Sequence, residues 1–266
     1  NLMMQIGNHT NTEIEEGLVR HMVLNALRSF KQKFSKKYGE LIIVCDDKHY
    51  WRKDIFRFYK ASRKKNREQS EIDWNNLFNI LNTIRDEINQ NMPYKVIQVP
   101  HCEADDIIAT IAKQSQEDVL ILSADKDFKQ LQIMQHVKQY DPINKKDVVC
   151  DDPSRFLLEL IIRGDSGDGI PNVLSPDNSF VDGIRQKPIS KKKIEKWIDS
   201  NHYDGVPEEN LNRNRKLIDF DMIPESIHDS IVQEFENQIK VSKNIDMFGY
   251  FVKHRLKMLV ESIGEF

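Results

Sequence analysis

Residues 95–127 read KVIQVPHCEADDIIATIAKQSQEDVLILSADKD, and this stretch decides the fold. It begins with KVIQV at 95–99 and closes with VLILS at 119–123, two short apolar runs typical of buried strands. Between them lies EADDIIATIAKQ, whose apolar residues recur at helical spacing. Strands that alternate with helices of this length are typical of a mainly parallel sheet with helices on both faces.

The same alternation extends toward the N-terminus. Residues 14–37 have helical periodicity and end at Gly39, LIIVCD at 41–46 predicts another buried strand, and a long helix runs from Trp74 to Pro93. The sequence therefore predicts an α/β fold with a mainly parallel central sheet flanked by helices. After Pro153 strand patterns stop, and a smaller helical region is expected, with helices at 153–163, 190–199, 208–219, 225–239 and 248–262. We expect one domain over 1–163 and a second over 164–266.

Composition narrows the functional class. The chain has 266 residues, 30% charged and 39% hydrophobic, which fits a globular enzyme, and it lacks a run of the roughly 20 apolar residues that cross a membrane. Its three cysteines share no short spacing, which favours reduced thiols in a cytoplasmic protein. The net charge of −3 hides two basic runs, nine Lys or Arg in 48–67 and six in 185–196. Such runs beside acidic ones suit the binding of a polyanion. The basic 60–70 segment lacks apolar periodicity and is expected to be a mobile loop within an arch near 48–70.

Acidic side chains follow each predicted strand. In parallel α/β sheets the carboxyl ends of the strands meet at one edge, so these acids are expected to gather there. Unless a cation neutralised them they would repel one another, and carboxylate oxygens suit Mg²⁺ or Mn²⁺. Each acidic motif alone is a common helix cap or turn, but together they predict a metal site. The acids are Asp46, Asp47, Glu103, Asp105, Asp106, Asp125 and Asp127, with Asp165 and Asp168 in the turn GDSGDGIPNV.

These motifs resemble a known family. EADDIIA, SADKDF and GDSGDGIPNV, in this order, are similar to the signature of the structure-specific 5′ nucleases, which include flap endonucleases and the 5′-nuclease domains of bacterial DNA polymerases. The resemblance extends through CDDKHYWRKDIFRFYKASRKKNRE, DWNNLF and LIDFDMIP to the C-terminal SIGEF, and is strongest to the T-even phage ribonuclease H branch. It covers nearly the whole chain, and it implies a 5′-nuclease (PIN-like) fold with a helix–turn–helix element for DNA.

The resemblance also implies roles for individual residues. Asp106 and Asp165 would support the site, Lys60 and Arg63 would act on the phosphate, and the fallback for Asp46 is Asp47. The implied metal ligands are Asp46, Glu103, Asp105, Asp125, Asp127 and Asp168. The implied nucleic-acid contacts are Arg52, Arg57, Tyr59, Gly167, Gly169, Lys191, Lys192 and Lys193.

The function implied is 5′-to-3′ exonuclease and flap endonuclease action, removing RNA primers and 5′ flaps in replication by two-metal hydrolysis. The expected cofactors are two Mg²⁺, for which Mn²⁺ could substitute, and a K⁺ at the helix–turn–helix. Expected partners are branched or flapped DNA, RNA–DNA hybrid, and a single-strand-binding protein or sliding clamp; a monomer in the host cytoplasm is expected. Relatives open with a strand ending in an aspartate, and we expect that strand upstream of Asn1.

Two other classes stay open at this point. A nuclease-like protein could clamp branched DNA without cutting it, and a cleavage assay on a labelled 5′ flap separates that possibility from an enzyme. An aspartate cluster on an α/β sheet also serves phosphatases that act on small substrates, but this leaves both basic runs unexplained.

Overall fold

The structure, a computed structural model, describes residues 15–240 and 245–266. The chain forms two compact units, each built from segments that lie far apart in the sequence. We call residues 1–45, 71–98 and 233–266 the terminal unit, and residues 46–70 and 99–232 the central unit. The expectations attached to the N-terminal start, including a strand before Asn1, lie outside the described residues.

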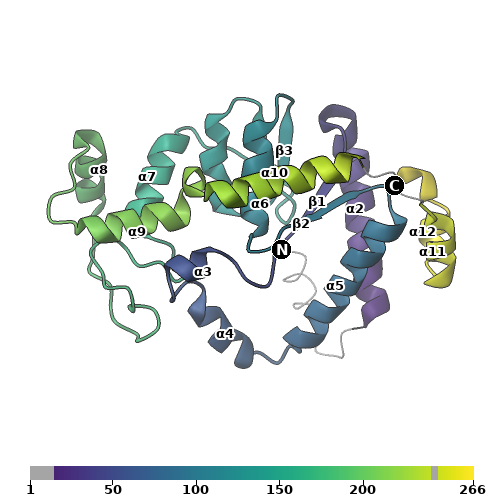
Figure 1. Cartoon of the computed structure of the whole chain (residues 1–266), viewed down its shortest axis with the longest axis horizontal. Coiled ribbons are helices and arrows are strands. Elements are labelled where there is room, and N and C mark those ends of the chain that lie inside the picture. Colours follow the sequence, from purple (N-terminus) through teal and green to yellow (C-terminus); the bar gives the residue numbers. More distant parts are fainter. Residues whose placement is uncertain (1–14, 241–244) are drawn as a thin grey trace. The chain divides into compact units, whose positions relative to one another are not determined.

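The terminal unit is a small helical assembly on a two-stranded sheet (Figure 1). β1 (Ile42–Cys45) and β2 (Lys95–Gln98) pair in parallel, as the sequence predicts. α5 (Trp74–Asn91) contacts both β2 and α2 (Glu16–Tyr38). The remaining described elements of this unit are α11 (Met247–Lys253), α12 (Lys257–Val260), the 3₁₀ turn Ile263–Glu265 and the end of α10 (Glu225–Lys240), which enters from the central unit.

A buried ion-pair network ties three helices of the terminal unit together. Arg20 of α2 is 4% exposed, and its guanidinium bonds both carboxylate oxygens of Glu87 of α5, at 2.8 and 2.9 Å. The Tyr250 hydroxyl of α11 donates to the same carboxylate at 2.8 Å. Burial would raise the pKa of Glu87, but the hydrogen bonds from Arg20 and Tyr250 outweigh it and the pKa is lowered.

Glu87→Gln is therefore expected to destabilise the protein in a pH-dependent way. Because the folded-state pKa of Glu87 lies below the unfolded value of about 4.3, its stabilisation is present above that pH and is lost as pH falls through the folded value. We expect a loss of ~2 kcal/mol in the free energy of unfolding at neutral pH. The measurement is urea denaturation at pH 7 and at about pH 3.5, where the difference from wild type should shrink. The neighbouring exposed pair partner Asp86, changed to Asn, is the control, and an equal Glu87→Gln effect at both pH values would contradict the assignment.

The central unit carries the second sheet. β3 (Val119–Leu122) and β4 (Val137–Asp141) are parallel, and β5 (Lys146–Val148) adds to β4 in antiparallel orientation. The helical elements of this unit are α3 (Arg52–Ile55), α4 (Ala61–Glu68), α6 (Ala104–Gln114), η1 (Lys126–Ile133), α7 (Pro153–Arg163), α8 (Lys191–Ser200), α9 (Glu208–Ile218), η2 (Phe220–Met222) and the start of α10. The predicted α/β fold with mainly parallel strands is confirmed.

α7 anchors the central unit and positions the turn that follows it. Asp152 caps its first turn by accepting from the Arg155 amide at 2.9 Å, and Pro153 occupies the first helical position. η1, α8 and α9 all contact α7, and Leu160, Ile161 and Ile162 of α7 are buried. No helix in residues 15–240 or 245–266 is both long and apolar enough to cross a membrane.

Two local predictions need correction, and two strands were not predicted. The 60–70 segment is not a loop throughout, since α4 is helical over 61–68; its Ala, Arg, Lys and Glu residues favour a helix without an apolar stripe. The helix expected over 248–262 is broken, because Arg255 adopts a left-handed φ of 57° between α11 and α12. The residues of β4 and β5 do not form apolar runs, so the sequence did not predict these two strands. The interval from 164 to 190 separates α7 from α8, so the helix–turn–helix stays a prediction.

Candidate nuclease active site

Glu103 lies at the N-terminus of α6 and is the most heavily bonded of the predicted acids. It is 3% exposed, and its carboxylate accepts from Arg52 at 2.9 Å, from the Tyr59 hydroxyl at 2.9 Å and from the Lys60 ammonium at 2.5 Å. Two positive charges and one hydroxyl meet on this carboxylate and fix its direction.

Arg52 and Trp51 bond acidic side chains at the start of α6. The Arg52 guanidinium is 3% exposed and also pairs with Asp106 at 2.8 Å, while its Nε donates to the Leu217 carbonyl at 2.8 Å. The Trp51 indole N–H donates to Asp106 at 3.0 Å, and Asp106 accepts from the Glu103 amide at 3.1 Å. Asp106 is fully buried and supports Glu103 from behind, in the place predicted for a supporting acid.

The glycine-rich turn after α7 brings Asp168 to Glu103. The Asp168 carboxylate accepts from the Tyr59 hydroxyl at 2.9 Å and from Arg63 at 2.6 Å, and pairs with the Lys60 ammonium at 3.5 Å. Its backbone carbonyl accepts from the Lys60 amide at 2.8 Å. Residues 59–63 and this turn are thus joined through both backbone and side chains, more than 100 residues apart in the sequence.

The turn itself depends on Gly164, whose φ is 69°. A Cβ at this position would lie 2.3 Å from the Ile170 carbonyl oxygen and 2.5 Å from that of Pro171. Asp165 closes the turn, accepting from the Gly167 amide at 2.7 Å. Backbone atoms fill the space, so no side-chain movement could relieve the clash.

Gly164→Ala is accordingly expected to distort the turn and to destabilise the central unit by ~3 kcal/mol or more. The readouts are thermal denaturation and cleavage activity. Gly183→Ala is the matched control, because its φ of 67° imposes similar backbone strain while nothing lies within 4 Å of the added Cβ. Equal losses for the two variants would show that backbone strain alone, rather than packing of the turn, explains the effect.

Asp125 and Asp127 follow β3 and begin η1. Asp125 caps η1 by accepting from the Asp127 amide at 3.0 Å, and buried Gln139 of β4 fixes the loop by donating to the Asp125 carbonyl at 2.7 Å. Between them, Lys126 pairs with Asp165 at 2.7 Å, linking η1 to the glycine-rich turn. The predicted acids of β3 and of the turn therefore lie on directly connected segments.

Mutual repulsion identifies the acids that share one region. The pKa of Asp105 is raised to about 8 by burial and by the charges of Asp125, Glu103 and Asp46, although Lys60 opposes this. Burial, together with the charges of Asp125, Asp165 and Asp168, raises the pKa of Asp127 to about 7. Burial is the largest cause of both shifts, and the charges that add to it are those of neighbouring acids. We call Asp46, Glu103, Asp105, Asp125, Asp127, Asp165 and Asp168 the carboxylate cluster.

Asp46 and Asp47 accept hydrogen bonds from different backbone amides. The Asp46 carboxylate accepts from the Ala104 amide at 2.8 Å, at the first turn of α6, which places it beside Asp105. Asp47 accepts from the His101 amide at 3.0 Å, and this and other backbone hydrogen bonds outweigh burial and lower its pKa. Asp47 thus stabilises the local loop, which favours Asp46 as the member of the cluster.

The donor chemistry of the cluster fits a divalent cation. All donors are oxygens, and the Asp127 Oδ1 atom is buried without a hydrogen-bond partner among the described residues. As the side chains stand, no three His, Cys, Asp or Glu residues in the described ranges are arranged so that they could hold a metal ion. Lys60, Arg63 and Lys126 bond Glu103, Asp168 and Asp165 instead. Metal binding would therefore require these carboxylates to turn away from their present partners.

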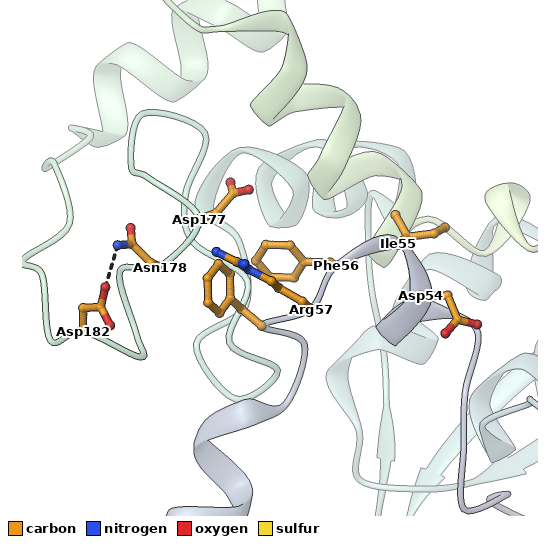
Figure 2. A pocket seen from close by; sticks show the side chains of 8 residues that line it. Asp54, Ile55, Phe56, Arg57, Asp177, Asn178 and Asp182 are labelled. Atoms are coloured by element: carbon orange, nitrogen blue, oxygen red, sulfur yellow. Dashed lines mark hydrogen bonds between the residues drawn. The ribbon is translucent and has the colours of Figure 1, made fainter.

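Several residues that were predicted to contact nucleic acid are buried or line a separate cavity. Arg52 and Tyr59 are each 3% exposed and bond the cluster or its support, so neither offers a surface to nucleic acid in this structure. Arg57 is exposed, stacks on Phe58 with 4.5 Å from its guanidinium carbon to the ring centre, and points toward Asp177 (Figure 2). It lines a cavity of about 670 Å³ with Asp54, Ile55, Phe56, Phe58, Asp177, Asn178 and Asp182, none of them from the cluster. The acidic lining does not favour phosphate.

The three lysines predicted to hold duplex occupy the first turn of α8. Lys191, Lys192 and Lys193 are all exposed there, where three positive charges oppose the helix dipole. Lys191 pairs weakly with Glu195 at 3.7 Å, and Lys193 lies 4.7 Å from the Trp197 ring centre. The three charges lower the stability of α8, and they form an exposed basic surface.

Sequence reasoning missed Lys126, Trp51 and Gln139. Lys126 lies between two acids that were predicted to bind metal. This position in the sequence was the only indication that Lys126 belongs to the site. Trp51 bonds a residue 55 positions away, and Gln139 bonds one 14 positions away. No local pattern in the sequence indicates such contacts.

Comparisons with known proteins identify the family of the chain. The family model described as the N-terminal resolvase-like domain of 5′-3′ exonucleases matches residues 4–156, and that of the T4 RNase H C-terminal domain matches residues 155–266. The chain is 35% identical to Ribonuclease H of Enterobacteria phage T4 over 271 residues, covering 96% of this chain and 88% of that protein. The chain belongs to the 5′-3′ exonuclease family.

Solved structures of family members share the fold. The 5′-exonuclease of phage T5 with zinc bound has a TM-score of 0.63 at 18% identity, covering 90% of this chain and 95% of that one. The bacteriophage T5 flap endonuclease, in a complex with DNA and metal ions, has a TM-score of 0.62 at 19% identity, covering 90% and 94%. The 5′-3′ exonuclease fold therefore extends over most of the chain, and the family is one of nucleases.

Proposed function

We propose that this family member is a Mg²⁺-dependent 5′ nuclease, acting as a 5′-to-3′ exonuclease and a flap endonuclease. The carboxylate cluster is the observation that carries the proposal, since its oxygen donors and raised pKa values of about 8 for Asp105 and about 7 for Asp127 suit divalent cations. The T5 relative in complex with DNA and metal ions supports the same chemistry.

Two Mg²⁺, or Mn²⁺ in their place, would activate a water molecule and stabilise the leaving oxygen of the scissile phosphodiester. Asp46 and Asp105 would help to hold one ion. Glu103, Asp125, Asp127 and Asp168 would complete the pair of sites, with Asp106 and Asp165 supporting them. A K⁺ ion at the glycine-rich turn is a further proposal from the family resemblance.

Basic side chains of the 59–63 segment would receive the phosphate. Lys60 and Arg63 already lie on Glu103 and Asp168, so a phosphate beside these acids is within reach of both cations. They would stabilise negative charge that develops on the phosphate oxygens during cleavage. Tyr59 bridges the same two carboxylates, and Arg52 orients Glu103; we reassign both from nucleic-acid contacts to positioning residues.

The substrate would be branched or flapped DNA and RNA–DNA hybrid, and the biological role would be the removal of RNA primers and 5′ flaps during replication in the host cytoplasm. Residues 164–266 would bind duplex backbone through the turn of Gly167 and Gly169 and through the α8 lysines. A monomer that works with a single-strand-binding protein or a sliding clamp is proposed from the resemblance alone.

Replacing Lys191, Lys192 and Lys193 together with Gln is expected to weaken duplex binding and to lower the slope of log K against log salt by about 2 to 3. The rate of cleavage at saturating DNA should change little, because these side chains lie outside the carboxylate cluster. Fluorescence anisotropy at several salt concentrations measures the slope. Lys138, Lys145 and Lys146, three exposed lysines of the β4–β5 hairpin, form the control triple. An unchanged slope for the α8 triple would remove α8 from the duplex site.

The whole proposal is tested by cleavage of a 5′-labelled flap with and without Mg²⁺. We expect metal-dependent products with 5′-phosphate and 3′-hydroxyl ends. Binding of the flap without cleavage at any Mg²⁺ or Mn²⁺ concentration would support a non-catalytic branched-DNA-binding protein instead. Hydrolysis of nitrophenyl phosphate without flap cleavage would support a phosphatase.

A further inference from the structure

Lys60 contacts two acidic side chains, which a residue that served only to bind the phosphate would not need to do. Its ammonium lies 2.5 Å from a Glu103 oxygen and 3.5 Å from an Asp168 oxygen, with 9% of the side chain exposed. One largely buried ammonium thus faces two carboxylates at ion-pair distance. The lysine therefore neutralises two acids of the carboxylate cluster.

The backbone holds Lys60 at this place. Its φ is 54°, a left-handed conformation that is unfavourable for a residue other than glycine, and its amide donates to the Asp168 carbonyl at 2.8 Å. The neighbouring Tyr59 is 3% exposed and bonds the same two carboxylates. Because the backbone is fixed to the acids, only the flexible side chain beyond Cα can change position.

Charge decides which cation the oxygens prefer. A divalent ion brings twice the charge of an ammonium to the same oxygens, and at a separation of a few ångströms the two cations repel each other strongly. One ammonium is shared between the carboxylates of Glu103 and Asp168, so it brings less than one full positive charge to each. The balance favours exchange of the ammonium for a divalent ion.

We propose that Lys60 is an exchangeable internal counter-cation of the carboxylate cluster: its ammonium and a divalent ion compete for the oxygens of Glu103 and Asp168. Metal loading turns the ammonium away from these acids and toward the position of the substrate phosphate. Lys60 thereby couples occupancy of the metal site to the contact that stabilises the phosphate. This inference rests on the proposed function, since it takes Glu103 and Asp168 to be metal ligands.

The first test is isothermal calorimetry of the DNA-free full chain with Mn²⁺. Lys60→Met keeps most of the side-chain volume and removes the competing charge, so we expect Mn²⁺ to bind about tenfold more tightly, the factor that corresponds to ~1.4 kcal/mol. Lys53→Met is the matched control, because Lys53 is an exposed lysine of the same segment that lies over the Tyr50 ring. It removes the same net charge without touching the cluster and should leave Mn²⁺ affinity almost unchanged.

The second test follows the ammonium directly. Acetylation of lysines in the wild-type chain, quantified by mass spectrometry, should speed up at Lys60 when Mn²⁺ is added, relative to Lys53. Equal Mn²⁺ affinity for wild type and Lys60→Met, or an acetylation rate at Lys60 that does not rise, would overturn the exchange. Absence of Mn²⁺ binding to both wild type and Lys60→Met would instead count against the proposed function itself.

Discussion

Replacing Asp105 with asparagine is expected to reduce metal-dependent flap cleavage by roughly 10³-fold or more, because Asp105 is a proposed ligand of the ion that would activate water. Burial and the charges of Asp125 and Glu103 raise the pKa of Asp105 to about 8. A cation bound beside Asp105 would offset this repulsion. Asparagine has nearly the same shape, so the fold should be retained and DNA affinity should stay level or rise as repulsion falls.

The measurement is single-turnover cleavage of a labelled 5′ flap in Mg²⁺, alongside anisotropy for binding. Asp118→Asn is the matched control, since Asp118 is exposed and lies just before β3, at the strand's opposite end from Asp125. Its activity should equal that of wild type. An Asp105→Asn enzyme that cleaved normally in Mg²⁺ would remove Asp105 from the metal site.

Lys60→Ala is expected to lower the turnover rate by roughly 10²- to 10³-fold, the range found when one charged or hydrogen-bonding group that stabilises a transition state is removed. The side chain approaches both Glu103 and Asp168 closely, so it is available to a phosphate beside them. Affinity for flap DNA should change only a few-fold, because in the proposed function the α8 lysines and other contacts to the DNA backbone would supply most of the binding energy.

Rates at saturating substrate separate turnover from binding. Lys53→Ala controls for the loss of a positive charge from the same segment and should cleave normally. If the Lys60→Ala enzyme lost DNA affinity in proportion to its rate, Lys60 would be a binding residue with no special part in the chemical step.

Part of the site could be predicted because it follows from local sequence. Glu103 and Asp105 open a helix directly after a predicted strand, and Asp125 follows another, so chain order alone places them at strand ends. Arg52 could not be assigned in this way. The basic 48–67 run favours a surface residue, yet burial against Asp106 and Leu217, 54 and 165 residues away, makes it a support for Glu103.

The sequence by itself determined the strand–helix–strand order, the helix starts at Asp73 and Asp152, and the acids that follow the strands, because propensity, capping and periodicity act over a few residues. Only the tertiary structure decided which cation faces which acid. Lys60 meets Asp168 and Lys126 meets Asp165 because the backbone of the glycine-rich turn is fixed against distant segments. Those pairings depend on burial and on charges brought together by folding, and such long-range terms leave no periodic pattern in the chain.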